Sequence, residues 1–258
     1  YEANDDGGLI DNINSYPGVL SVRGDVRISG SFIDGNASKN NTLAFNYFPN
    51  VGDMVIDTAD SLNFTNDEAG KKSFRNMLAH EHGHGLGLVH ACPVDGTKLM
   101  EPVLSTNFVG PQFDDILSAV NLYGDIYEKN GSSKTNNSSV QAHDLGEIST
   151  SLNVSDSAIS GGDDADYFKF KVNGSRNATI TVTPTNQEEY LKGYEVDGVC
   201  SAGTSFDPAT RQKLKVRLMS TDGSTVLSQS TAPALGRTAV ILDITVPSSN
   251  SDYFIEVT

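Results

Sequence analysis

The sequence has few basic residues and no long apolar run, and each shortage excludes a class of protein. Its 258 residues include 18 lysines and arginines against 33 aspartates and glutamates, for a formal net charge of −15. Such an acidic chain, without a basic cluster, argues against nucleic acid as a partner. No apolar run is long enough to cross a membrane, so we expect no membrane span.

Cysteine is also scarce, with only Cys92 and Cys200 in the chain. Neither lies in the closely spaced pair that binds a structural metal. Their wide separation fits a disulfide between distant regions, and the alternative is two unpaired thiols. The length suits either one large domain or two ordinary ones.

Histidine is scarce too, but its distribution is informative. Four of the five histidines lie in residues 80–90, which read H-E-H-G-H-G-L-G-L-V-H. This stretch fills every specified place of the pattern H-E-x-x-H-x-x-G-x-x-H. The residues before it predict a helix, because Phe74, Met77 and Leu78 keep apolar helical spacing. Asp67 and Glu68 stand where the first turn of a helix favours acids.

The spacing of these histidines predicts a catalytic zinc site. On a helix, His80 and His84 project from the same face and can reach one zinc ion at about 2.0–2.1 Å. Gly87 lets the chain leave the helix, and the turn returns His90 as a third nitrogen ligand. Three protein ligands leave one tetrahedral position to water, and Glu81, next to the first ligand, points toward the same site without needing to bind the metal. A chance match is the alternative, but the long pattern constrains five positions.

The chain divides by pattern into two parts and a linker. Short apolar runs over residues 19–33, 43–48 and 52–57 predict strands, and a second helix is expected over 112–123, ended by Gly124. Strands followed by helices indicate an α+β catalytic domain over residues 1–127. Residues 128–139 form a polar linker rich in Gly, Ser and Asn. Residues 140–258 show short alternating strands and no credible helix, which predicts an all-β sandwich.

The zinc motif, followed by L-M-E-P, resembles the matrixin family of metzincin metallopeptidases, in particular bacterial secreted members. The resemblance covers about residues 19–124. It implies a metzincin-like domain with a twisted mixed sheet, an active-site helix and a C-terminal helix. It also implies that His80, His84 and His90 bind Zn²⁺ and that Glu81 is the general base. Met100 would form the methionine turn, an apolar floor beneath the metal.

The same resemblance implies further sites. The specificity pocket would be walled by the loop at about residues 103–113. The family's second, structural zinc is not expected, because Phe45 and Val55 stand where its histidines would be. The opening helix and first strand of the family are not evident before residue 19, which leaves open whether the N-terminal part of the domain is complete. An edge strand would bind substrate backbone through Leu43, Ala44, Phe45 and Asn46, and Ca²⁺ would be held by Asp34, Asp57 and Asp60.

The second part of the chain, from D-D-A-D-Y-F-K-F-K-V to D-Y-F-I-E-V, resembles the bacterial pre-peptidase C-terminal domain. Such domains accompany secreted peptidases, which implies a role in secretion or in binding to matrix or a cell surface. The acidic loops of the chain, rich in Asp, Asn and Gly, offer oxygen ligands for calcium. The alternative for each loop is a solvated turn.

Together these features predict a secreted zinc endopeptidase that acts on protein or peptide substrates. The main alternative is an extracellular binding or adhesion protein with an inactive peptidase domain, against which the intact Glu81 argues. Another metzincin branch is a third interpretation. An extracellular location favours the Cys92–Cys200 disulfide, whereas a free Cys92 thiolate could instead bind the zinc and inhibit.

Overall fold

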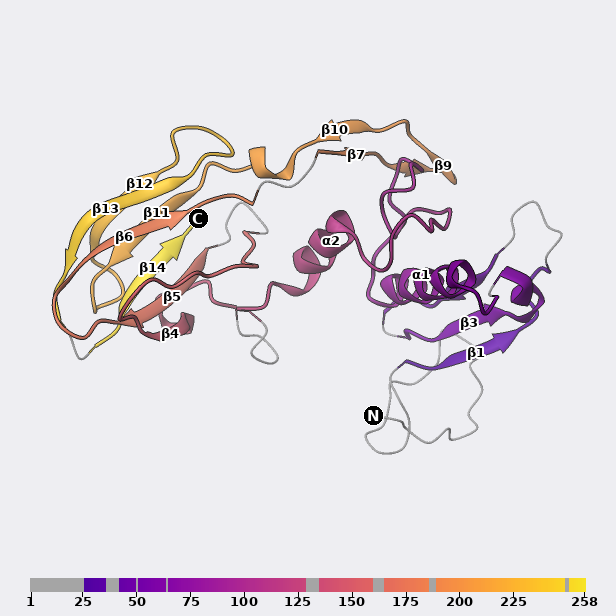
Figure 1. Ribbon diagram of the computed structural model, residues 1–258, viewed down its shortest axis with the longest axis horizontal. Coiled ribbons are helices and arrows are strands. Elements are labelled where there is room, and N and C mark those ends of the chain that lie inside the picture. The colour runs from indigo at the N-terminus through magenta and orange to yellow at the C-terminus, as the bar shows by residue number, and fades with distance from the viewer. Residues whose placement is uncertain are drawn as a thin grey trace. The chain divides into compact units, whose positions relative to one another are not determined.

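The computed structural model describes residues 26–35, 42–49, 51–63, 65–128, 135–159, 165–185, 189–248 and 251–258 (Figure 1). The chain divides into two compact units. Unit 1 comprises Tyr1–Ala119 and Tyr190–Ser205, and unit 2 comprises Val120–Glu189 and Phe206–Thr258. The segment Tyr190–Ser205, which the sequence pattern placed with the β-rich part, thus groups with the metal-motif part.

Unit 1 contains a mixed three-stranded sheet, as predicted. Its strands are β1 (Ile28–Ser31), β2 (Ala44–Asn46) and β3 (Met54–Asp57), in the order β1-β3-β2. The central strand β3 runs parallel to β1 and antiparallel to β2. The strand predicted over 43–48 is shorter in the structure, and residues 19–25 of the first predicted strand lie outside the described residues.

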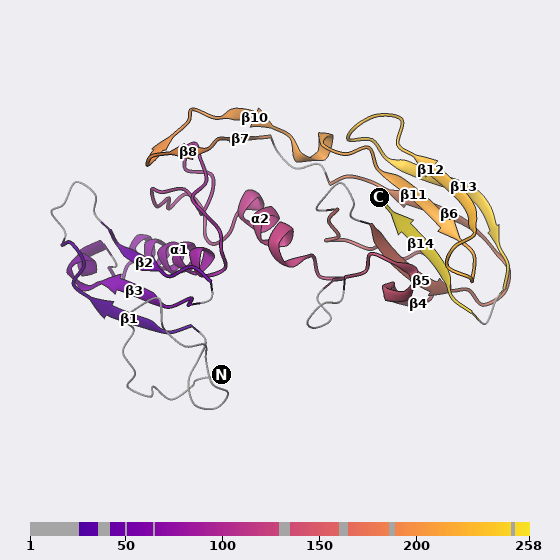
Figure 2. The ribbon, with the colours of Figure 1, turned by 180° about the vertical axis from the view of Figure 1, so that it is seen from behind.

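The long helix α1 (Glu68–Gly85) carries most of the metal motif and packs on β2 and β3 (Figures 1 and 2). Asp67 is its N-cap rather than part of its first turn. The Asp67 carboxylate accepts a 2.8 Å hydrogen bond from the backbone N–H of Gly70. This bond satisfies a donor that the helix itself cannot. A short 3₁₀ helix, η1 (Thr58–Asn63), connects β3 to the segment before α1.

The second predicted helix is present as α2 (Phe113–Tyr123), and Gly124 follows it with a φ of +76°. Its apolar side chains are not buried, since Ile116 is 50% exposed and Tyr123 is 51% exposed. The buried residue of this helix is Asp115. Polar contacts made by that carboxylate, described below, therefore position the start of α2 more than its apolar face does.

Residues 190–206 form a narrow β excursion. Its outer pair is β7 (Tyr190–Lys192) with β10 (Thr204–Phe206), and its tip is the hairpin of β8 (Glu195–Val196) and β9 (Val199–Cys200). Asp197 and Gly198 form the two-residue turn with φ values of 51° and 77°. Positive φ at both central residues is what an Asp-Gly hairpin turn requires. The predicted disulfide between Cys92 and Cys200 is present and ties this hairpin to the metal-motif segment of unit 1.

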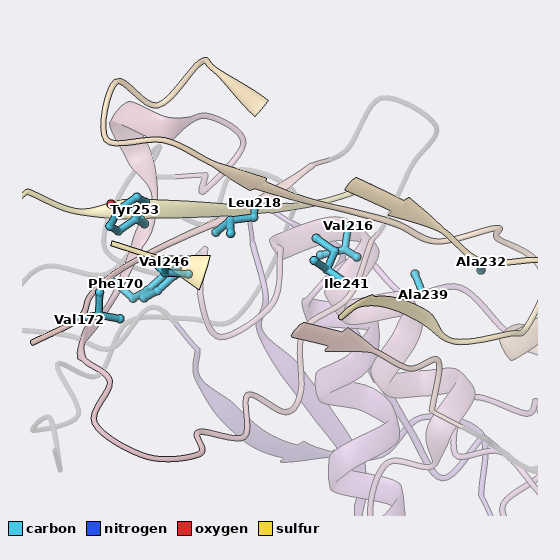
Figure 3. Close-up of a cluster of buried hydrophobic side chains, with 9 residues drawn as sticks. All are labelled: Phe170, Val172, Val216, Leu218, Ala232, Ala239, Ile241, Val246 and Tyr253. Carbon is cyan, nitrogen blue, oxygen red and sulfur yellow. The ribbon is translucent and has the colours of Figure 1, made fainter. Parts of the chain in front are cut away.

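Unit 2 is built from two antiparallel-rich sheets that share a buried core (Figure 3). Side chains from both sheets form this core, including Phe170, Val216 and Leu218 from the larger sheet and Ile241 and Val246 from the smaller one. The larger sheet has the order β12-β11-β14-β5-β4, and the smaller one pairs β13 with β6. These strands are β4 (His143–Glu147), β5 (Asp166–Lys171), β6 (Arg176–Val182), β11 (Lys215–Met219), β12 (Val226–Thr231), β13 (Ala239–Val246) and β14 (Tyr253–Val257).

Two short 3₁₀ helices, η2 (Ser139–Gln141) and η3 (Pro208–Thr210), complete the regular elements described for unit 2. The alternating apolar residues in the sequence explain the strands of unit 2, because every second residue of β5 is buried, as in Phe168 and Phe170.

Across the described residues, no helix has the length and apolar character needed to span a membrane.

Candidate metal centre

The three motif histidines converge at the end of α1. Their candidate ligand nitrogens all lie within 4.8 Å of one another. The Nε2 atoms of His80 and His84 are 3.1 Å apart, and the ring centroids of His84 and His90 are 4.9 Å apart. One turn of helix separates the first two residues, so a shared direction for their rings follows from helix geometry.

Backbone carbonyls orient the first two imidazole rings. Nδ1 of His80 lies 2.7 Å from the carbonyl oxygen of Leu99, and Nδ1 of His84 lies 2.8 Å from that of Leu88. A carbonyl oxygen can only accept, so each Nδ1 carries the proton and each Nε2 keeps its lone pair for a metal. This tautomer is the one that metal-bound histidines adopt when a partner holds the second nitrogen.

Gly87 makes the turn that brings His90 to the other two histidines. It has a φ of +94°. Residues with a β-carbon rarely adopt this conformation. The backbone N–H of Gly87 donates to the carbonyl of His84, and that of Leu88 donates to the carbonyl of Gly83. These bonds close the end of α1 and fold the chain back, as the motif predicts.

Glu81 lies beside the histidines and is buried, with 7% of its surface exposed. Burial raises the pKa of its carboxyl group to about 7, against the opposing effect of the backbone N–H of Asn46, which donates to it. Burial also lowers the pKa of His80 to about 4 and lowers the pKa of His84. The two imidazoles are therefore neutral near pH 7, as metal ligands must be.

Met100 is buried against helix α1. Its side chain is 2% exposed, and an ideal β-carbon built on Gly83 would stand 2.5 Å from its sulfur. The Met100 carbonyl also accepts a 2.7 Å hydrogen bond from the backbone N–H of Ala91, next to His90. The methionine thus contacts α1 at Gly83, between His80 and His84.

The predicted substrate strand lies at one edge of the described sheet, as the order β1-β3-β2 requires. Within it, Ala44 and Asn46 are buried and Phe45 is half-buried. A β-carbon on Gly85 would stand 2.5 Å from the Asn46 side-chain nitrogen, so the helix end and β2 are in close contact. The Asn46 side chain therefore faces the helix, and substrate binding by this strand stays a prediction.

The three acids predicted to hold calcium are brought together. Carboxylate oxygens of Asp34, Asp57 and Asp60 lie within 4.8 Å of one another, and the last two residues are fully buried. Asp57 accepts from the backbone N–H of Ala59 at 2.8 Å, and from those of Asp34 and Gly35 at 3.1 Å. These donors lower its pKa to about 2, so the carboxylate is ionised. Clustered carboxylate oxygens are the ligands that calcium prefers.

Three buried polar residues that support the site carried no signal in the sequence. Asp115 of α2 accepts from the backbone N–H groups of Leu99 and Met100, at 2.9 and 3.0 Å. Glu101 accepts from the backbone N–H groups of residues 95–98 and from the Lys98 ammonium. Asn76 of α1 donates to the carbonyls of Ser105 and Phe108 and accepts from the N–H of Gly110. Their role depends on long-range contacts, which spacing cannot reveal.

This geometry can be compared with known proteins. Residues 26–124 match the Matrixin family model. The matrixin match covers β1 to α2 and includes the histidine cluster, the acid cluster and Met100, and it implies a metzincin α+β fold for this region.

A curated relative extends the similarity beyond the matrixin region. The chain is 29% identical over 211 residues to the protein named matrix metalloproteinase-B from Caenorhabditis elegans. The alignment covers 70% of this chain and 38% of that relative, so the chain spans well under half of its length. No solved structure matches the chain.

Proposed function

We propose that the chain is a secreted zinc-dependent endopeptidase of the matrixin type. The observation that carries this proposal is the convergence of three imidazoles beside a buried glutamate. Both metal-facing Nε2 atoms of α1 are oriented by carbonyls on the far side of the rings. Three nitrogen ligands suit zinc and leave a coordination position open, which is typical of catalytic rather than structural sites.

The chemistry follows from the residues around this position. A zinc ion bound by the three histidines would polarise a substrate carbonyl and a water molecule. Glu81, whose pKa of about 7 lies near neutrality, would remove the proton from the attacking water. The protonated Glu81 would then deliver that proton to the departing amine. Burial of the carboxyl group serves both steps, because it keeps the carboxylate basic enough to accept a proton and acidic enough to release it.

Substrate would bind as an extended strand along β2. An edge strand offers unpaired backbone groups, and a peptide that adds to it is held by main-chain hydrogen bonds. Leu43, Ala44, Phe45 and Asn46 would supply this edge, directly beside Glu81. The loop after Met100, which Asn76 ties to α1 through Ser105, Phe108 and Gly110, would wall the specificity pocket.

We further propose that Asp34, Asp57 and Asp60 bind calcium and so stabilise the loop beside β3. Saturating calcium, at about a hundred times its Kd, should raise the free energy of unfolding by about 3 kcal/mol. Asp60→Asn should abolish this gain, because it removes one negative ligand. Glu147→Gln is the matched control, since it removes an exposed acid from β4. An equal calcium effect in wild type and Asp60→Asn would refute this site.

For the domain organisation we propose boundaries of 1–127, 128–139 and 140–258, with a β-sandwich of the pre-peptidase C-terminal type in the last part, from which the excursion Tyr190–Ser205 departs to group with unit 1. The two sheets that share one apolar core support the sandwich. The Cys92–Cys200 disulfide supports an extracellular location, since disulfides persist in oxidising compartments. We also propose that this last part of the chain binds to extracellular matrix or to a cell surface.

The alternative function, an adhesion protein with an inactive peptidase domain, has less support. Glu81 is present, buried and next to the histidines. The Cys92 sulfur is held in the disulfide and is not available to bind a metal as a thiolate. Both observations favour a working peptidase over a silent one.

The proposal is tested by incubating the purified chain with an internally quenched peptide library and with casein. We expect cleavage that 1,10-phenanthroline abolishes while calcium is kept in excess, and that added Zn²⁺ restores. Cleavage that persists without zinc, or no cleavage by protein that carries a full equivalent of zinc, would contradict it.

A further inference from the structure

Each motif histidine has an oxygen atom near its Nδ1, but the third oxygen is of a different kind. His80 and His84 face the backbone carbonyls of Leu99 and Leu88. Nδ1 of His90 faces a carboxylate instead, with Oε2 of Glu195 at 3.4 Å. Glu195 belongs to strand β8, in the β excursion that lies outside the matrixin match.

Covalent and hydrogen-bonded links hold this carboxylate beside the metal site. Glu195 is the register partner of Cys200 across the β8–β9 hairpin, and Cys200 is joined to Cys92, two residues after His90. The backbone N–H of Gly193 donates to the carbonyl of Cys92 at 2.6 Å. The strand that carries Glu195 is thus fixed against the segment that carries His90 from two directions.

The two backbones approach closely at Gly193. A β-carbon on Gly193 would stand 3.1 Å from the Cys92 carbonyl carbon and the same distance from its β-carbon. The β excursion therefore lies directly against the chain at Cys92. An open hollow beside this contact is lined by Val89, His90, Tyr194 and Glu195 among others. The close packing of the two backbones keeps the Glu195 carboxylate near the ring.

We propose that Glu195 is a positioning residue for the metal ligand His90, supplied by the disulfide-tethered hairpin. By accepting the Nδ1 proton it would keep His90 in the tautomer whose Nε2 lone pair faces the metal, and it would make that nitrogen a stronger donor. This completes the set of three oriented imidazoles with a residue that the metal motif does not contain. The inference rests on the proposed zinc site.

The size of the effect follows from the geometry. Loss of a partner that orients a metal-bound histidine lowers metal affinity by about 10- to 100-fold. The side chains of His90 and Glu195 are 33% and 30% exposed. Water therefore screens the contact and can replace part of it. We expect a loss near the lower limit, about tenfold.

The test compares Zn²⁺ affinity, measured by competition with a chromophoric chelator, in wild type, Glu195→Ala, Glu195→Gln and Asp197→Asn. Glu195→Ala should bind zinc about tenfold more weakly. Glu195→Gln should show a smaller loss, because its amide oxygen can still accept the Nδ1 proton. Asp197→Asn is the matched control from the same hairpin and should stay within about twofold of wild type. Substitution with Co²⁺ should give a visible absorption band that shifts in Glu195→Ala and not in Asp197→Asn.

A second comparison separates the carboxylate from general support by the hairpin. The double variant Cys92→Ser with Cys200→Ser, which frees the hairpin, should weaken zinc binding as much as Glu195→Ala does. Adding Glu195→Ala to it should cost less than a further twofold, since the two changes remove the same contact.

Wild-type affinity and an unshifted Co²⁺ band in Glu195→Ala would overturn the inference, even if peptide cleavage changed. The inference would also be overturned if the losses of zinc affinity from the cysteine variant and from Glu195→Ala multiply when the changes are combined, because the two changes would then remove different contacts. If wild type itself binds no zinc, the proposed function has failed and the inference fails with it.

Discussion

The sulfur of Met100 lies where a side chain on Gly83 would have to be. An ideal β-carbon at Gly83 would approach this sulfur to 2.5 Å, well inside van der Waals contact, although Gly83 stands between His82 and His84 in the middle of the metal motif. The contact joins helix α1 to the turn at Leu99 and Met100, and the Leu99 carbonyl of this turn orients His80. Gly83 therefore matters to the site through its missing side chain.

Gly83→Ala tests this contact. The displaced Met100 side chain should cost about 1–3 kcal/mol, and the better helix propensity of alanine should return up to about 1 kcal/mol. We expect a net loss of about 1 kcal/mol in the free energy of unfolding, measured by urea denaturation. In a Met100→Ala background the same change should become neutral or stabilising, because the clash is gone. An equal loss in both backgrounds would show that the sulfur is not the cause.

Asn76 links helix α1 to the loop at residues 103–113, which is expected to wall the specificity pocket. Its buried amide makes three hydrogen bonds with the backbone of residues 105–110, at 2.8 to 2.9 Å. Asn76→Ala leaves these groups unpaired and should destabilise the fold by about 3 kcal/mol. At a temperature where the variant is folded, KM for peptides should rise more than kcat falls.

The matched control for this prediction is Asn107→Ala. Asn107 lies in the same loop, but its side chain is exposed and its contact with the Gly96 carbonyl is 3.5 Å long. We expect unchanged KM and stability in this variant. A rise in KM of equal size in both variants would mean that the loop responds to any substitution, and the specific link through Asn76 would be refuted.

Glu81→Gln separates metal binding from proton transfer. The amide keeps the size of the side chain but cannot accept a proton from water. Turnover of a fluorogenic peptide should fall by a factor of about 10² or more. Zinc content, measured by mass spectrometry of the metal, should stay at one equivalent, because the three histidines remain. Near-normal turnover in the zinc-loaded variant would refute the role of Glu81.

The buried carboxyl group should also leave a signature in the stability of the metal-free protein. The pKa of Glu81 is raised from 4.5 to about 7 by burial, so folding favours the protonated form. Its contribution to stability is therefore present below about pH 4.5 and is lost as pH rises through 7. Burial lowers the pKa values of His80 and His84, so folding favours their neutral forms. Their contribution to stability therefore grows as pH rises, opposite to that of Glu81 in part of this range.

Comparison with Glu81→Gln isolates the glutamate, since both proteins contain the histidines. Relative to wild type, the metal-free variant should gain on the order of 2–3 kcal/mol between about pH 4.5 and 7.5. Urea denaturation at a series of pH values measures this difference. A difference that stays constant with pH would mean that the carboxyl group is not perturbed by burial.

The sequence predicted much of this site because local spacing decides much of it. A helix places His80 and His84 on one face, a glycine with positive φ returns His90, and alternating apolar residues predict the strands of unit 2. The acid trio Asp34, Asp57 and Asp60 was predicted from the resemblance. The predictions of the helix, the turn and the strands required no knowledge of distant contacts.

The unpredicted features all depend on contacts between segments far apart in the chain. Asp115 holds the turn at Leu99 and Met100, and Glu195 faces His90 from an excursion that spacing assigned to the other half of the chain. The disulfide was predicted, but not that Tyr190–Ser205 would group with unit 1. α2 was placed correctly, but the sequence did not indicate that its buried residue is the carboxylate Asp115, which contacts the distant turn at Leu99 and Met100.

The central claim is that His80, His84 and His90 bind one zinc ion and leave a coordination position open to water. X-ray absorption spectroscopy of the protein loaded with one equivalent of zinc tests this most directly. We predict three nitrogen ligands with imidazole scattering and one oxygen ligand, at about 2.0–2.1 Å, and no sulfur. A sulfur ligand at about 2.3 Å, a fourth imidazole, or a spectrum unchanged when all three histidines are replaced by alanine would contradict the account.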